Sequence, residues 1–205
     1  MRLLRTPLGI IRANFGAYLV VNALIYIPFL LGMGAALVFP DLGAAEQAAM
    51  RENGTTGLVT SLLDDFWLFS LTIFAVNTLT VGVLTILLPS MVVPFAGIAA
   101  FMYRVFTIGV ALAPVNATVA TTLVPHSLTV LIEFQAYALV MLGAYLLGRA
   151  WLRPAAVGAR TRRQGYLHGL RQTGWLCLPA LALFVVGALY ESFEIIYLLP
   201  LLFAR

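Results

Sequence analysis

Long runs of apolar residues are the feature of this sequence that most limits its fold. Five such runs lie between charged residues and prolines, at about 16–39, 66–88, 92–113, 124–148 and 175–203. A helix that crosses the roughly 30 Å hydrocarbon layer of a bilayer needs about 20 mostly apolar residues, because it rises about 1.5 Å per residue. We therefore expect an all-α, polytopic transmembrane bundle with about five spans, which comprises residues 1–205 as a single domain.

The composition excludes a water-soluble domain. Of the 205 residues, 62% are hydrophobic and 10% are charged, and the mean hydropathy is +1.00. A soluble fold of this size cannot bury so much apolar surface, whereas lipid can cover it. The formal net charge of +4 is concentrated near the ends of the apolar runs. We interpret it as a signal of orientation and of contact with membrane lipids, not of nucleic-acid binding.

The distribution of arginine predicts which ends of the spans face the cytoplasm. Three arginines precede the first run, whereas the connection after it carries Asp41, Glu46, Glu52, Asp64 and Asp65 with the single Arg51. Six more follow the fourth run: Arg149, Arg153, Arg160, Arg162, Arg163 and Arg171. Arginine and lysine near span ends mark the cytoplasmic side. Five spans place both arginine-rich segments on that side, so we expect a cytoplasmic N-terminus and an external C-terminus.

Two segments outside the spans are expected to contact the membrane surface. Residues 1–15 predict an interfacial amphipathic helix that begins near Thr6-Pro7, because proline favours the first helical position. The basic cytoplasmic segment 149–174 is expected to lie on anionic lipids, and docking of a partner protein is the alternative. The run 16–39 is too long for the apolar part of a signal peptide, so we expect a retained signal anchor.

Five ionisable residues fall within the predicted spans: Arg104, His126, Glu133, Glu191 and Glu194. A charge inside the bilayer costs several kcal/mol, so such residues usually face protein or water and often mark function. His126 and Glu133 are seven residues apart and share a helix face, as do Glu191 and Glu194. We interpret Arg104 as one half of a structural ion pair with a glutamate.

The charges within the predicted spans do not balance, because these spans contain one arginine and three glutamates. Protonated glutamates, a water-filled cavity, or positive charge from a second membrane chain would each resolve the imbalance. The last option favours a hetero-oligomer, and the first would provide a general acid or base. Asn77, in the middle of the second run, is expected to hydrogen-bond to neighbouring helices.

Motifs of soluble enzymes are absent from the sequence. It contains no Walker loop, dinucleotide-binding glycine fingerprint, HExxH zinc motif or GxSxG elbow. With two histidines and the single Cys177, a zinc site built from this chain alone is not expected. We therefore expect neither a metal nor a cofactor.

One pattern of residues resembles a known family. It consists of Asn77 in the second run, Gly109 in the third, Pro125-His126 at the start of the fourth, and Glu133-Phe134-Gln135-Ala136 after it. This pattern resembles the stage II sporulation protein M family of multispan membrane proteins over about residues 70–150. In that family a span begins with Pro-His-Gly and carries a glutamate about one turn later.

The chain departs from that pattern in three places and is identified as a divergent member. Ser127 replaces the glycine, Val130 occupies the usual position of the glutamate, and Glu133 stands one turn further on. Arg104 stands near the usual Asn-Gly pair of the family. The resemblance implies an accessory membrane subunit that assembles with peptidoglycan-degrading enzymes or with other membrane complexes.

Three functions remain open at this point. The first is an accessory subunit of a heteromeric complex in a bacterial cell membrane. The second is a membrane subunit of a ribosomal-peptide-modifying enzyme, similar to linaridin-type dehydratase or epimerase partners. In it, Glu133 or His126 would move a proton of the peptide substrate and Arg104 would stabilise negative charge. The third is an export permease with glutamates as proton carriers, although the sequence shows no inverted repeat.

Overall fold

The computed structural model describes residues 2–52 and 54–204, and in these ranges every regular element is a helix. Two stretches are π-helical (η1 and η3) and one is a 3-10 helix (η2). In chain order the elements are α1 (Arg2–Ala13), α2 (Phe15–Val38), α3 (Pro40–Glu52), α4 (Thr55–Leu62), α5 (Phe66–Ala75), η1 (Val76–Leu87), α6 (Leu88–Val92), α7 (Ala96–Ala111), α8 (Ala117–Leu152), η2 (Pro154–Val157), α9 (Arg162–Phe193), η3 (Glu194–Leu198) and α10 (Leu199–Phe203).

Four helices are long and apolar enough to cross a bilayer. They are α2, the continuous helix Phe66–Val92 formed by α5, η1 and α6, the helix α8, and the continuous helix Arg162–Phe203 formed by α9, η3 and α10. Their lengths are 24, 27, 36 and 42 residues. These helices indicate a multi-pass membrane protein, in agreement with the fold class predicted from the apolar runs.

The predicted count of five spans is wrong, because the third apolar run does not form a helix of spanning length. α7 covers 16 residues, which extend about 24 Å and fall short of the roughly 30 Å hydrocarbon layer. Pro94 precedes the helix and Pro114 follows it, and both prolines keep apolar neighbours out of the helix. The third predicted span, 92–113, included those apolar neighbours.

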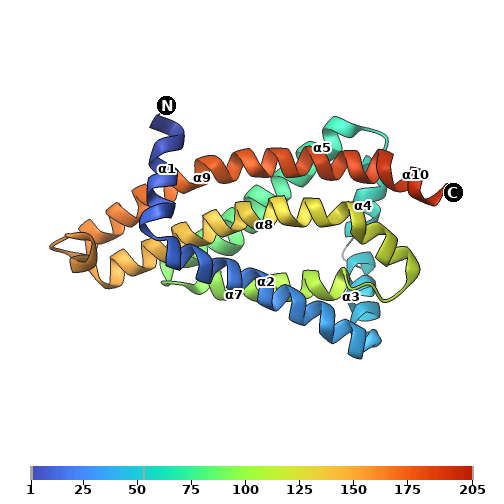
Figure 1. The fold of residues 1–205 in the computed structure, drawn as a ribbon, viewed down its shortest axis with the longest axis horizontal. Helices are drawn as coiled ribbons and strands as arrows, with labels where there is room; N and C mark the ends of the chain where they lie inside the picture. Colours follow the sequence, from blue (N-terminus) through green and yellow to red (C-terminus); the bar gives the residue numbers. More distant parts are fainter. Residues whose placement is uncertain (1, 53, 205) are drawn as a thin grey trace.

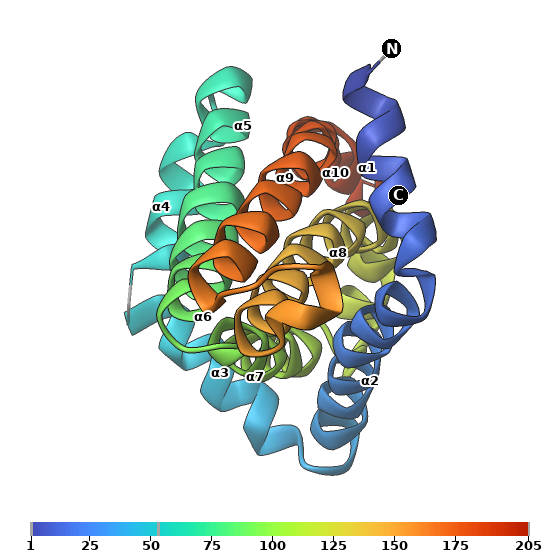
Figure 2. The ribbon, with the colours of Figure 1, turned by 90° about the vertical axis from the view of Figure 1, so that its left-hand side faces the viewer.

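The helix α8 forms the centre of the bundle. Seen from the end of the molecule in Figure 2, α8 is surrounded by α2, α7, α9 and the helix that contains η1, and it contacts all of them. The stretch from Ala136 to Ala144 is buried at every position, so other helices cover this part of α8 on all sides. Its most extensive contacts are with α9, the following helix, and the two form an antiparallel hairpin (Figure 1).

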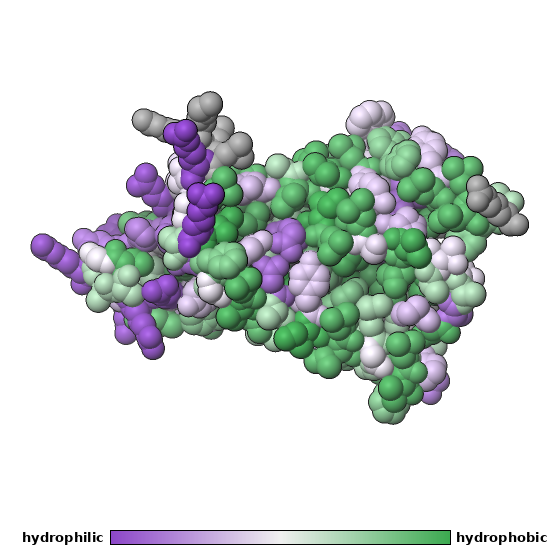
Figure 3. Space-filling model, viewed as in Figure 1, coloured by the Kyte–Doolittle hydropathy of each residue, from purple (hydrophilic) through white to green (hydrophobic). Residues whose placement is uncertain are grey.

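Large apolar side chains also cover the outside of the bundle. Leu31 on α2, Leu71 on α5 and Val186 on α9 are all more than half exposed. Figure 3 shows hydrophobic residues over most of the length of the molecule, with hydrophilic residues gathered at one end. Such a surface would be costly in water, whereas lipid tails would cover it without penalty.

Two glycines let α2 and α7 approach closely. A Cβ atom on Gly32 would lie 2.1 Å from the Phe106 carbonyl oxygen, and one on Gly109 would lie 2.1 Å from the Phe29 carbonyl oxygen. Each helix thus presents a glycine to the backbone of the other. Small residues at such crossings allow the close packing that holds membrane helices together. The short α7 is therefore fixed against α2.

Both arginine-rich segments lie at the same end of the molecule, where α1 and the α8–α9 turn are found (Figure 1, Figure 3). The helix α1 begins at Arg2, so the start predicted near Thr6 is wrong, and Pro7 lies inside the helix. A proline this early removes one backbone hydrogen bond only, and α1 packs against α9. Most of residues 149–174 belong to α8 and α9, which are joined by a turn around η2.

Candidate functional site

A polar face on α8 is the strongest candidate for a functional site. His126, Thr129, Glu133 and Tyr137 recur every three or four residues, so they form one stripe along the helix. The residues Gly187, Glu191 and Glu194 of α9 and η3 follow the same spacing on the facing helix. The closely packed α8–α9 hairpin brings the two stripes together.

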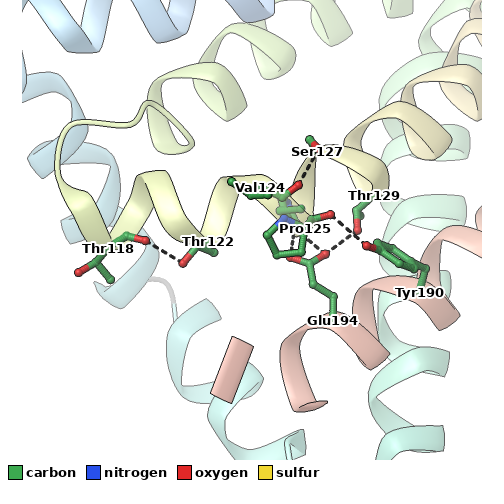
Figure 4. A network of polar contacts seen from close by, with 9 residues as sticks. Thr118, Thr122, Val124, Pro125, Ser127, Thr129, Tyr190 and Glu194 are labelled. Carbon is green, nitrogen blue, oxygen red and sulfur yellow. Dashed lines mark hydrogen bonds and ion pairs between the residues drawn. The ribbon is translucent and has the colours of Figure 1, made fainter. Parts of the chain in front are cut away.

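The first half of this site joins His126 and Thr129 to Glu194. Figure 4 shows Thr129 and Glu194 pointing toward each other. The Nδ1 atom of His126 lies 3.2 and 3.3 Å from the two carboxylate oxygens of Glu194, and Thr129 donates a 2.8 Å hydrogen bond to the same carboxylate. Glu194 is completely buried, whereas the His126 side chain is 18% exposed. One turn earlier, Tyr190 donates a 3.2 Å hydrogen bond to the Pro125 carbonyl oxygen. The carboxylate is therefore held by contacts with α8 alone.

The second half of the site is centred on Glu133. The Asn77 amide of η1 donates a hydrogen bond to the Glu133 carboxyl group, and Tyr137 donates a 2.9 Å hydrogen bond to the Asn77 side-chain oxygen. Glu191 follows Gly187 by one turn of α9, so it lies on the face of that helix that meets Glu133. The absence of a side chain at Gly187 provides the space, since a Cβ there would lie 3.1 Å from Glu133 Cγ.

Glu191 connects the two halves. It lies one turn after Gly187 and one turn before Glu194, so it stands between the two halves on the facing helix. Carboxyl groups such as those of Glu133 and Glu191 can hydrogen-bond to each other only when one of them carries a proton, since ionised carboxylates only accept.

Both π-helical stretches lie at this site. Asn77 is the second residue of η1, and Glu194 is the first residue of η3. A π-helix is rare and occurs often at functional sites, because its wider turn shifts the register of the residues that follow. Here the residue at or next to the start of each stretch, Asn77 or Glu194, contacts α8.

Arg104 does not join this network. It lies in the middle of α7, and in the ranges 2–52 and 54–204 its buried Nε atom has no hydrogen-bond partner. The ion pair between His126 and Glu194 is the only one that the described residues form. The structure thus does not place Arg104 in the ion pair with a glutamate that we expected. Glu133 is bound by Asn77, and Glu194 by His126 and Thr129.

Sequence reasoning missed a second polar cluster, centred on Gln135. The Gln135 amide donates hydrogen bonds of 2.9 and 3.2 Å to Asn22 and Tyr26, and Tyr18 donates a 2.5 Å hydrogen bond to its oxygen. The three partners are spaced four residues apart on α2, and this spacing was visible in the sequence. Thr129 and Tyr137 were also missed, although both fall on the His126 face.

The basic residues of the segment 149–174 point away from this site. Arg149 is half-buried at the end of α8, and the other five arginines are exposed on the turn and the start of α9. Within the described part of the chain, no group of three histidine, cysteine, aspartate or glutamate side chains is placed to hold a metal ion.

Comparison with known proteins does not assign the chain to a family. A scan against models of protein families, a search of curated proteins and a search of solved structures found no match.

Proposed function

We propose that this chain is an integral membrane subunit of a heteromeric complex, and that a second membrane chain packs against α7. The observation that carries the proposal is the half-buried Arg104, whose buried Nε atom lacks a hydrogen-bond partner among the described residues. A charged side chain within the bilayer costs several kcal/mol unless protein or water compensates it. Glu133 is bound by Asn77, and Glu194 by His126 and Thr129, so an acceptor for Arg104 has to come from outside this network.

The exposed face of α7 supports the same proposal. Ala99 and Ala100 are exposed one turn before Arg104, and the neighbouring Tyr103 is 74% exposed. Small residues allow a helix of another chain to approach closely, and an aromatic side chain beside them offers a large contact. A partner helix on this face would bring an acidic or carbonyl group to Arg104.

The resemblance to the stage II sporulation protein M family is part of this proposal. Its members act as accessory subunits, which fits a chain built around long apolar helices. We place the N-terminus and the arginine-rich end on the cytoplasmic side of a bacterial cell membrane, because basic residues near span ends favour that side.

Purification from the native cells tests the proposal. A photo-crosslinking amino acid at Tyr103 is expected to capture a second membrane protein, and native gels in mild detergent are expected to show a particle larger than the monomer. The Arg104→Gln variant should lose that particle. Arg51→Gln, which removes an exposed charge from α3, is the matched control. Crosslinks to lipid alone, with unchanged migration of Arg104→Gln, would contradict the proposal.

A second candidate function is acid–base chemistry on a peptide at the membrane. The neighbouring carboxyl groups of Glu133 and Glu191 favour it, because such a pair can deliver and take up a proton. We expect an infrared carbonyl band of a protonated carboxyl group that disappears in Glu133→Gln and persists in Glu52→Gln. A precursor peptide encoded beside this chain should change in mass, or in the chirality of a residue if that residue is epimerised, when both are co-expressed. A peptide unchanged in mass and in residue chirality rules out this function.

A further inference from the structure

A groove at the arginine-rich end of the molecule is separate from the polar site. It has a volume of about 620 Å³ and lies where the α1–α2 junction, the start of α7 and the end of α8 meet. Volumes of this size accommodate small organic molecules. Residues from four helices line it, including Ala13, Gly16, Val20, Ile98, Tyr145 and Arg149.

The wall of the groove is apolar and open to its surroundings. Val21 and Ile98 are buried and form its floor, whereas Val20 and Phe15 line it and remain more than half exposed. Phe15, Val20 and Val21 belong to α2, which is long and apolar enough to cross a membrane. The groove is therefore open to lipid and offers a surface that suits an acyl chain.

A strained residue holds one side of the groove. Phe95 has a φ of 68°, in the left-handed region that side-chain-bearing residues rarely adopt. Its ring packs on Gly148, where a Cβ would lie 2.7 Å away, and its centroid lies 6.0 Å from that of Tyr145. Tertiary packing thus fixes Phe95 at the start of α7, and the wall is formed before any ligand binds.

The charge at the groove is positive and is not neutralised by this chain. Arg149 is the one charged residue that lines it, and Arg12 precedes the lining residue Ala13. The sequence has no aspartate or glutamate in residues 1–40, 66–132 or 134–190, and these ranges together include all the lining residues. Figure 3 shows hydrophilic residues gathered at this end of the molecule. A guanidinium group in this position favours a phosphate.

We propose that this groove binds one anionic phospholipid of the leaflet at the arginine-rich end. Its acyl chain lies against Val20, Val21 and Ile98, and its phosphate contacts the guanidinium group of Arg149. The negative headgroup complements the unneutralised arginines, whereas a zwitterionic lipid carries no net charge to match them. This proposal does not depend on the partner chain proposed for Arg104.

Native mass spectrometry of the purified protein in detergent tests the proposal. The protein is titrated with phosphatidylglycerol or with phosphatidylcholine that has the same acyl chains. We expect the first phosphatidylglycerol to bind about fivefold more tightly than phosphatidylcholine. Arg149→Gln should remove this preference, whereas Arg160→Gln, which removes an exposed arginine at the same end, should keep it.

A second pair of variants tests the apolar part of the groove. Gly16 lines it, and a Cβ at this position would meet no atom within 4 Å, so Gly16→Phe should fill the groove and weaken the binding of both lipids. Gly34 on the same helix has equally open surroundings outside the groove, so Gly34→Phe should bind as the unmodified protein does.

Three results would overturn the proposal. In the first, Arg149→Gln and Arg160→Gln lower the preference equally, which indicates a diffuse charge effect. In the second, Gly16→Phe binds lipid normally although thermal melting shows that it is folded. In the third, glycerol phosphate displaces phosphatidylglycerol, which indicates a site for a soluble phosphate instead of a lipid.

Discussion

His126 on α8 and Glu194 at the start of η3 are 68 residues apart in the chain and lie 3.2 Å apart through Nδ1 and a carboxylate oxygen. This contact joins the start of the central helix to the end of the last long helix. Thr129 binds the same carboxylate from the next turn of α8. Because Glu194 is completely buried, the contact cannot be replaced by water without opening the bundle.

Replacement of Glu194 should therefore destabilise the protein. Glu194→Ala leaves Thr129 and His126 without their acceptor, and we expect a loss of about 1–3 kcal/mol in the free energy of unfolding. Glu194→Gln should lose less, because its amide oxygen can still accept from Thr129. Denaturant unfolding in detergent measures the change. The exposed Glu52→Ala is the control, and equal stabilities of Glu194→Ala and Glu52→Ala would show that the contact adds nothing.

The hydrogen bond from Tyr137 to Asn77 should couple η1 to α8. Its length is 2.9 Å, and Asn77 also binds Glu133. Asn77→Ala, Tyr137→Phe and the double variant form a double-mutant cycle, for which we expect a coupling energy of about 0.6–1.7 kcal/mol. Strictly additive losses of stability would mean that the two side chains do not interact in the folded protein.

Two glycines of α2 should respond oppositely to the same substitution. A Cβ on Gly32 would overlap the Phe106 carbonyl oxygen, whereas one on Gly34 would meet nothing within 4 Å. Gly32→Ala should therefore cost about 1–3 kcal/mol, because α7 must move away. Gly34→Ala should be neutral or stabilising by up to about 1 kcal/mol, since alanine favours the helix. Melting temperatures in detergent compare the two, and a tolerated Gly32→Ala would refute the close crossing.

Replacement of Gln135 should loosen α2 from α8. Gln135→Leu removes the shared partner of Tyr18, Asn22 and Tyr26. We expect faster amide hydrogen exchange in the first half of α2, because unsatisfied polar groups favour local opening. The exposed Tyr103→Phe on α7 is the control. Unchanged exchange in α2 would mean that apolar packing alone holds this pair of helices.

The polar site could be predicted from the sequence only in part. The spacing of His126 and Glu133, and of Glu191 and Glu194, places each pair on one helix face, since helical periodicity is a local property. Thr129 and Tyr137 fall on the same face and could have been included. The partners could not be assigned, because they depend on how far two helices are shifted along each other and on the π-helical stretches.

Arg104 is an example of a residue whose partner could not be predicted from the sequence. From composition, an arginine among three glutamates predicts an ion pair, and the surplus of acid predicts a positive partner. In the fold, Glu133 accepts a hydrogen bond from Asn77 and Glu194 pairs with His126, whereas Arg104 lies on α7, which carries no glutamate. Among the charged side chains that the structure describes, the one with an unpaired buried atom is thus Arg104, in contrast to the surplus of acid in the composition.

The sequence by itself determined that the chain is helical and that several of its segments are suited to lipid, because apolar length is a property of each segment alone. It predicted five spans where the structure has four helices of spanning length, since Pro94 and Pro114 shorten α7 within an unbroken apolar run. Only the tertiary structure decided that His126 binds Glu194, that the Nε atom of Arg104 has no partner among the described residues and that a groove forms beside Arg149. Each of these features lies between separate helices, and the packing of side chains between the helices determines which residues come into contact.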